Sequence, residues 1–285
     1  RESMEKIWRN RVGGGLRGHL GKHLAFHTSF LQSREQGTRT YTTRDDIFEK
    51  RLEIPQLKGG LADFHEGKAY VVFKLPFASL EIGKDDVAWG PAPGQNLILS
   101  GNASSFNMMR LRADLGAFKV VSIHGMLRPC PDRGDTPGCG GLADERTSYW
   151  PNGVPRILER QKNIAAHRLE VAIVPWLDLG FQEVVVYGDR PQEWSYLNPL
   201  MFYWAAQSYL GDKDNVMMGL DLDIHPGRGR RYYLAYVVDD LKKAGIFSDD
   251  FANKFSLQAG LEWADPLGWA DADLRIEYVR IEPWI

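Results

Sequence analysis

Hydrophobic and polar side chains alternate along many short segments of this chain. The clearest example is 215–225, where one face carries Val216, Met218, Leu220, Leu222 and Ile224 and the other carries Met217, Gly219, Asp221 and Asp223. Residues 254–263 and 269–281 follow the same rule. Successive side chains of a β-strand point to opposite faces of its sheet. A period of two therefore predicts strands with one apolar face and one polar face.

Twelve segments of this kind are predicted to pair as six antiparallel hairpins. They are 9–19, 23–33, 66–74, 78–83, 106–114, 117–127, 163–174, 178–188, 215–225, 230–240, 254–263 and 269–281. Two further pieces have other possibilities. Residues 239–254 have helix-compatible spacing, and residues 198–210 could form a short helix or extend a strand.

The links between the segments alternate between tight and long. The tight links are 20–22, 75–77, 115–116, 175–177, 226–229 and 264–268, and the long links are 34–64, 84–105, 128–162, 189–214 and 241–253. Short periplasmic turns and long external loops are typical of outer-membrane barrels. We therefore predict an all-β fold, an antiparallel up-and-down transmembrane β-barrel with its long loops projecting outward at one end.

Aromatic residues near the tight links support a membrane location. Phe77, Trp176, Tyr232, Trp263 and Trp269 lie in or beside these links. Such rings suit a membrane–water interface, because one part of each is apolar and another can stay wet. Ordinary core aromatics near turns are the alternative interpretation.

In a membrane barrel the two faces of each strand meet different solvents. The apolar stripe would face lipid, and it is represented by Leu220, Leu222, Leu257 and Leu274. The polar stripe would fill the lumen, and its predicted members are Asp221, Asp223, Gln258, Arg275 and Glu277. A soluble sandwich shows the same alternation with its apolar face inside. The asymmetry of the links favours the barrel.

Composition and length set further limits. The 285 residues suffice for one large β domain, and we predict a single barrel domain over residues 1–285. The chain has 35 Lys and Arg residues and 37 Asp and Glu residues. This balance gives no excess of positive charge that would indicate nucleic-acid binding. No apolar run is long enough for a transmembrane helix. The chain starts at Arg1 and ends without a closing strand signal, so we expect about twelve strands of a larger barrel with both ends missing.

The two cysteines lie in one long link. Cys130 and Cys139 flank a segment with turn-forming Pro and Gly, which predicts a disulfide and an oxidising compartment. A loop of this size would stabilise the fold by about 2–3 kcal/mol. Two free thiols in a flexible loop are the alternative. Two cysteines without a neighbouring histidine pair make a poor zinc site, so we expect no metal and no cofactor.

Asp221 and Asp223 are the strongest catalytic candidates. On one strand face their carboxylates would lie about 6.5–7 Å apart, between the spacings of retaining and inverting glycosidases. A soluble β-rich glycan-active enzyme is therefore one hypothesis. The preferred interpretation is that both carboxylates keep a barrel interior polar.

Aromatic residues in the long links are candidates for sugar binding. We predict glycan contacts, where aromatic faces meet nearby polar groups, at Trp150, Trp194, Tyr196 and Trp204. Packing of the loops themselves would explain these residues almost as well.

Several segments resemble the Wzi family of capsule assembly proteins. They are Trp89-Gly90-Pro91, Asn96-Leu97-Ile98-Leu99-Ser100 with Asn102-Ala103, Tyr196-Leu197-Asn198-Pro199-Leu200, Asp214-Asn215-Val216 with Gly219 to Asp223, and Asp239-Asp240. The likeness runs in order through most of residues 60–245. Proteins of this family are outer-membrane β-barrels with more strands than this chain supplies, so the resemblance implies an open, strongly curved sheet here.

The resemblance also implies a function. Its members associate capsular polysaccharide with the cell surface and act as lectin-like anchors, not as enzymes. The expected partners are capsular or extracellular polysaccharide and outer-membrane lipid or lipopolysaccharide, and the barrel is expected to be monomeric. An outer-membrane porin-like channel of unknown solute is a further hypothesis, besides the glycan-active enzyme.

Overall fold

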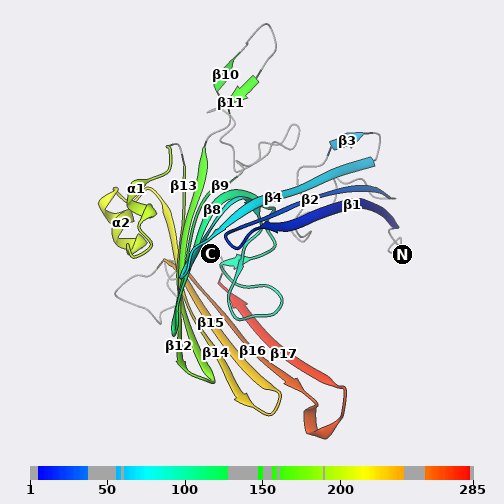
Figure 1. Ribbon diagram of the computed structural model, residues 1–285, viewed down its shortest axis with the longest axis vertical. Coiled ribbons are helices and arrows are strands. Elements are labelled where there is room, and N and C mark those ends of the chain that lie inside the picture. The colour runs from blue at the N-terminus through cyan, green and yellow to red at the C-terminus, as the bar shows by residue number, and fades with distance from the viewer. Residues whose placement is uncertain are drawn as a thin grey trace.

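An antiparallel sheet of 13 strands dominates the computed structural model, which describes residues 6–37, 56–58, 61–127, 147–149, 156–158, 161–188, 190–240 and 254–282. Along the sheet each strand pairs with its neighbours in chain order (Figure 1). The strands are β1 (Ile7–Leu20), β2 (Leu24–Gly37), β4 (Leu61–Lys74), β5 (Ala78–Asp85), β8 (Phe106–Leu115), β9 (Phe118–Leu127), β12 (Lys162–Val174), β13 (Leu177–Gly188), β14 (Asn215–Gly227), β15 (Arg230–Asp240), β16 (Lys254–Ala264) and β17 (Asp273–Ile281), with β3 (Gln56–Lys58) paired to β4.

These twelve strands confirm the twelve segments predicted from the alternation. Most boundaries agree within one or two residues, and three differ more. Strand β2 ends at Gly37, four residues beyond the predicted end. Strand β4 begins at Leu61, five residues before the predicted start. Strand β17 begins at Asp273 and not at Trp269, because a 3₁₀ turn, η5 (Pro266–Gly268), precedes it and the backbone has positive φ at Asp265 and Asp271.

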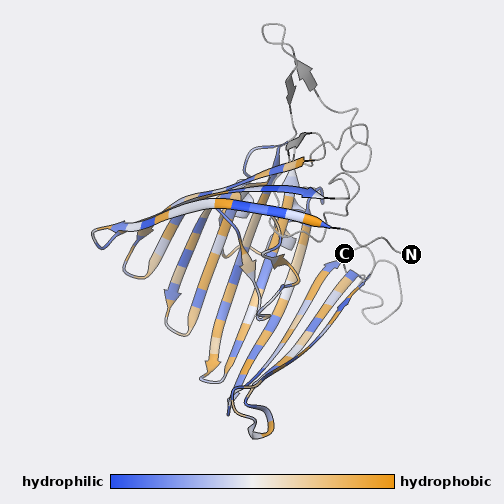
Figure 2. Cartoon of the chain, turned by 90° about the vertical axis from the view of Figure 1, so that its right-hand side faces the viewer, coloured by the Kyte–Doolittle hydropathy of each residue, from blue (hydrophilic) through white to orange (hydrophobic). Residues whose placement is uncertain are grey.

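The sheet is strongly curved and open, as expected from the resemblance. Figure 2 shows the hairpin turns along one rim of the curved sheet. Strands β1 and β17 are the two ends of the strand order, and in the described residues they do not pair with each other. We call the inner side of this curve the concave face and the outer side the convex face (Figure 1).

The two faces differ in polarity as a membrane barrel requires. Leu220 on the convex face is 52% exposed, whereas its neighbour Asp221 on the concave face is buried. The alternation of hydrophilic and hydrophobic residues is visible along the strands in Figure 2. Other large apolar side chains exposed on the convex face are Trp8, Val12, Leu16, Leu111, Leu234, Leu274 and Ile276. The sheet is therefore apolar outside and polar inside.

Smaller elements lie within the long links. They are the pairs β6 (Ala88–Trp89) with β7 (Leu99–Ser100) and β10 (Thr147–Tyr149) with β11 (Arg156–Leu158), and the helices α1 (Trp194–Leu197) and α2 (Tyr203–Tyr209). Helix α2 confirms the helical option for 198–210. Of the 239–254 segment, residues 241–253 lie outside the described part. Within that part, no helix has the length and apolar character needed to cross a bilayer.

We predict that Leu222→Arg impairs folding into lipid vesicles. Leu222 lies on the convex face opposite Leu179, and an arginine near the middle of a bilayer costs about 2–4 kcal/mol. The measurement is the folded fraction in vesicles across a urea series.

The matched control is Ala172→Arg, which places the same charge on the concave face opposite Asp178. This variant should fold nearly as well as the parent chain. Equal losses for the two variants would contradict the assignment of the convex face to lipid.

Candidate functional site

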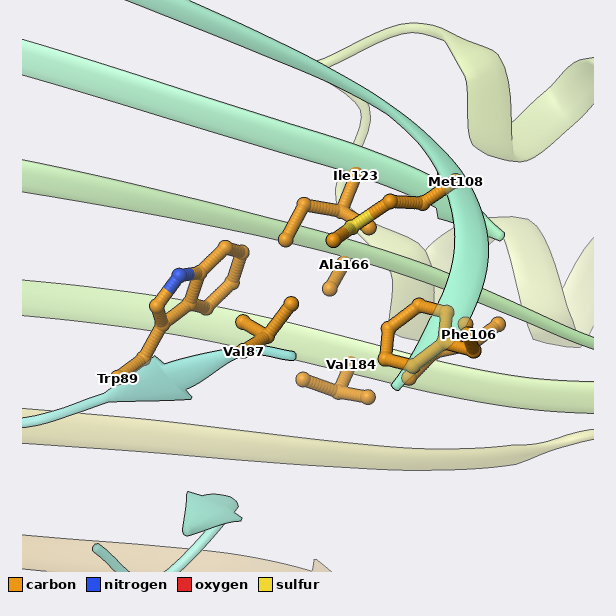
Figure 3. Packing of buried hydrophobic residues seen from close by; sticks show 8 residues of the cluster. Val87, Trp89, Phe106, Met108, Ile123, Ala166 and Val184 are labelled. Carbon is orange, nitrogen blue, oxygen red and sulfur yellow. The ribbon is translucent and has the colours of Figure 1, made fainter. Parts of the chain in front are cut away.

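The link between β5 and β8 enters the concave side of the sheet. Its side chains Val87 and Trp89 are buried against inward-facing residues of β9, β12 and β13, among them Ile123, Ala166 and Val184 (Figure 3). We call residues 86–105 the inner segment. The prediction that this long link projects outward is wrong, because its apolar side chains pack on an apolar patch of the concave face.

Hydrogen bonds tie the inner segment to the opposite part of the sheet. The amide Nε2 of Gln258 donates to the carbonyl oxygen of Gln95 over 2.9 Å, and Arg231 Nη2 donates to the carbonyl oxygen of Pro91 over 2.5 Å. Asn96 Oδ1 accepts the backbone N–H of Ala92, which fixes the turn within the segment. The inner segment thus bridges the concave face from β9 and β13 to β15 and β16.

The five lumen residues predicted from sequence all lie on the concave face. Asp221 accepts two hydrogen bonds from Arg168, of 2.6 and 2.8 Å, and both side chains are nearly inaccessible to solvent. Asp223 accepts two from Arg231, which also pairs with Glu262. Gln258 holds the inner segment, as described above. On β17, Arg275 donates to Glu277, and Glu277 also accepts the phenol of Tyr233.

Two glycines make room for these side chains. A Cβ at Gly180 would meet the carboxylate of Asp221 and the guanidinium of Arg168. A Cβ at Gly260 would meet the ring of Tyr233, which lies directly across from it in the ladder. Interior glycine in a strand often marks such a close approach.

The arginine pairs bear directly on the catalytic hypothesis. A glycosidase needs one protonated carboxylic acid that can donate to the leaving group. Here Asp221 and Asp223 are each bound by a guanidinium in a two-pronged arrangement that suits a carboxylate. The geometry of these two residues therefore gives the glycan-active enzyme hypothesis no support.

Further ionic pairs on the concave face were not predicted from the sequence. Arg110 on β8 contacts Glu81 at 2.5 Å and Asp85 at 3.0 Å, both on β5. Lys68 on β4 pairs with Asp86 at the start of the inner segment. All of them lie at alternate positions of their strands or at a strand end. The period of two therefore predicts that they share the concave face, although it does not predict which residues pair.

The link between β13 and β14 packs on the convex face instead. We call residues 190–214 the outer segment, and it contains α1 and α2. The rings of Tyr196 and Tyr203 are fully buried, in one cluster with Val185, Tyr187 and Val216 of the underlying strands. The outer segment therefore covers β13 and β14 near the rim that carries the long links (Figure 1).

Tyr196 is a structural residue of this segment. Its hydroxyl donates to Asp214 over 2.6 Å, and Arg190 holds the same carboxylate at 2.5 Å. Burial raises the pKa of the Tyr196 phenol, and the bond to Asp214 raises it further, so the phenol stays a donor. The prediction that Tyr196 contacts a glycan is wrong, because its fully buried ring has no surface to offer.

Glu183 anchors the outer segment and was missed in the sequence. It is fully buried on β13, pointing to the convex side, and its carboxylate accepts the backbone N–H groups of Tyr203 and Trp204 at the start of α2. His167 of β12 lies 2.9 Å from it. In the run Gln182-Glu183-Val184-Val185-Val186 polar and apolar residues do not alternate, so the sequence does not indicate on which face Glu183 lies.

The other predicted glycan contacts and the predicted disulfide differ in where they lie. Trp194, at the start of α1, is 83% exposed, and Trp204, in α2, is 51% exposed. Trp150 and the predicted disulfide of Cys130 and Cys139 lie outside the described residues. Two of the four predicted glycan contacts thus remain exposed within the described part of the chain.

Comparison with known proteins identifies one family. The family model described as capsule assembly protein Wzi matches residues 9–283, nearly the whole chain. No curated protein matches the chain.

Among solved structures, three examples are weakly similar to the chain. The NanC porin is 10% identical, with a TM-score of 0.36 over 89% of this chain and 98% of that protein. OpdQ of Pseudomonas aeruginosa is 12% identical, with a TM-score of 0.38 over 98% and 76%. OpdK of the same organism, solved with vanillate, is 11% identical, with a TM-score of 0.39 over 96% and 80%.

We predict that Trp89→Ala releases the inner segment. Truncating a buried tryptophan costs about 3–5 kcal/mol, and Trp89 is a principal apolar contact of this segment. The expected results are a lower free energy of unfolding in detergent and new protease cleavage within residues 86–105, mapped by mass spectrometry. Pro93→Ala, at an exposed position of the same segment, should change neither quantity. Unchanged cleavage in Trp89→Ala would contradict the packing described here.

We predict that Glu183→Ala loosens the outer segment. Removing this carboxylate leaves two backbone N–H groups of α2 without their acceptor and removes the contact with His167. A buried donor left without a partner costs about 1–3 kcal/mol. Hydrogen exchange over residues 194–210 should accelerate while the strands stay protected. Glu183→Gln keeps an acceptor and should show a smaller change. If both variants exchange like the parent chain, Glu183 is not the anchor.

Proposed function

The chain belongs to the Wzi family of capsule assembly proteins, and we propose that it attaches capsular polysaccharide to the cell surface as a non-enzymatic anchor. It is an outer-membrane β-barrel protein. The observation that carries the proposal is the family match over residues 9–283. The proposed partners are capsular or extracellular polysaccharide and outer-membrane lipid or lipopolysaccharide, and the proposed state is a monomeric barrel.

The inner segment on the concave face supports an anchor over a solute channel. The inner segment crosses this face and is fixed to β15 and β16 by Arg231 and Gln258. Beside it, the carboxylates Asp221 and Asp223 are bound by arginines. A channel needs an open, hydrated lumen. This interior instead directs contacts with a polymer to the rim with the long links.

Trp194 is the described residue that best fits a sugar contact at this rim. Its ring is exposed, and three polar side chains lie close in sequence, Arg190, Glu193 and Ser195. Glu193 already accepts the Ser195 hydroxyl over 3.2 Å, and Arg190 lies 3.5 Å from Glu193. A sugar ring can stack its C–H face on the indole and bond its hydroxyls to such groups. We propose that Trp194 contributes to polymer attachment in this way.

We predict that Trp194→Ala weakens polymer attachment by about tenfold, which corresponds to about 1.4 kcal/mol. The measurement is the ratio of cell-associated to released polysaccharide, together with binding of purified polymer to the protein in detergent. Trp194→Phe keeps an aromatic face and should retain part of the binding.

Asp223→Asn tests the enzymatic alternative at the same time. It lies on the concave face, away from the proposed contact, and should leave attachment largely intact. Loss of attachment in a folded Asp223→Asn variant, with none in Trp194→Ala, would overturn the proposal.

A further inference from the structure

Part of the outer segment is free of charge in a chain where 25% of residues are charged. From Trp194 to Gly211 there is no Asp, Glu, Lys, Arg or His, whereas Glu193 and Asp212 stand directly on either side. The corner between α1 and α2 also exposes large apolar side chains. Leu200 is 85% exposed, and Met201, Phe202 and Trp204 are exposed beside it. We call Leu200 to Trp204 the apolar corner.

The apolar corner continues the lipid-facing surface of the sheet. The ring of Phe202 stacks on that of Phe181, with centroids 5.7 Å apart and planes 16° from parallel. Phe181 is the fifth residue of β13 and pairs with Leu220 of β14, whose side chain is exposed on the same convex face. One apolar surface therefore runs from Leu220 through Phe181 to Phe202.

Several backbone N–H groups of this segment find partners within the protein. The first N–H groups of α2, from Tyr203 and Trp204, bond to Glu183, and the N–H of Ala206 bonds to the carbonyl of Phe202. Leu200 and Met201 donate to the side chain and the carbonyl of Asn198. Irregular backbone is tolerated near hydrocarbon only when the protein itself supplies its partners. In the apolar corner, the N–H groups of Leu200, Met201, Tyr203 and Trp204 have such partners.

We propose that the apolar corner inserts into the outer leaflet of the membrane and contacts acyl chains. Three observations carry this: the absence of charge in 194–211, the exposed apolar side chains, and their continuity with the lipid-facing strands. Exposed aromatic and aliphatic side chains are what a membrane element presents to the interface and the acyl chains. Trp204 then faces lipid, whereas Trp194, next to the charged pair Arg190 and Glu193, lies outside the membrane where it can contact polysaccharide.

The test places a fluorophore on the corner. Leu200→Cys, in a Cys130→Ser, Cys139→Ser background, carries nitrobenzoxadiazole and is reconstituted in phospholipid vesicles. Lys213→Cys, at an exposed polar position just beyond the uncharged stretch, is the matched control. Doxyl-labelled lipid should quench the label at position 200 several-fold more than at position 213, and aqueous iodide should show the reverse order.

A second measurement avoids the cysteine background. Brominated lipid quenches intrinsic tryptophan fluorescence, and Trp204→Phe in the native chain should abolish part of that quenching, whereas Trp194→Phe should not. Either method can overturn the inference. Iodide quenching at position 200 equal to that at 213, no contribution of Trp204 to lipid quenching, or protection of position 200 by added polysaccharide would place the corner in water. Neither measurement depends on whether Trp194 binds polymer.

Discussion

The structure depends on one constraint, which is that a bilayer core offers no hydrogen-bond partners to a peptide backbone. The antiparallel ladders from β1 to β17 pair the backbone of each strand with its neighbours, and the short hairpin turns lie along one rim. Once the backbone is paired, the choice of side chain on each face follows from the medium it meets. Leu220 and Leu222 can then alternate with Asp221 and Asp223 along β14 without conflict.

The concave face has to accommodate the charges that the convex face excludes. Two arginines, Arg168 and Arg231, each hold a carboxylate of β14 in paired hydrogen bonds. Such buried pairs offset their loss of hydration only when the geometry is good and the remaining polar atoms are bonded. An apolar patch around Ile123 and Val184 also lies on this face, and Trp89 of the inner segment packs there. The concave face thus carries ion pairs in one part and a folded link in another.

The sequence predicted the strands well because their signal is local. In 215–225 and 254–263 the polarity of each residue predicts the face of the strand on which it lies. The twelve strands and their tight links therefore follow from the period of two. The face on which a long link packs depends on residues that are distant in the sequence. Whether 86–105 folds inward depends on the match between Trp89 and a patch built from β9, β12 and β13. For the same reason exposed aromatics could not be separated from buried ones, and Tyr196 was placed at the surface although Asp214 and Tyr203 enclose it.

The inner segment covers apolar residues of the concave face, whereas the outer segment covers a buried carboxylate, Glu183, on the convex face. A carboxylate on the lipid-facing side of a strand is costly unless protein covers it. Helices α1 and α2 supply that cover, and Glu183 in turn supplies the acceptor that the first N–H groups of α2 require. Without the helices, Glu183 and His167 would face hydrocarbon. Without Glu183, the start of α2 would carry unpaired donors against an apolar surface. The outer segment and the convex face of the sheet therefore depend on each other. Trp194 is the first residue of α1, and the contacts of Tyr196 and Arg190 with Asp214 hold this helix in place.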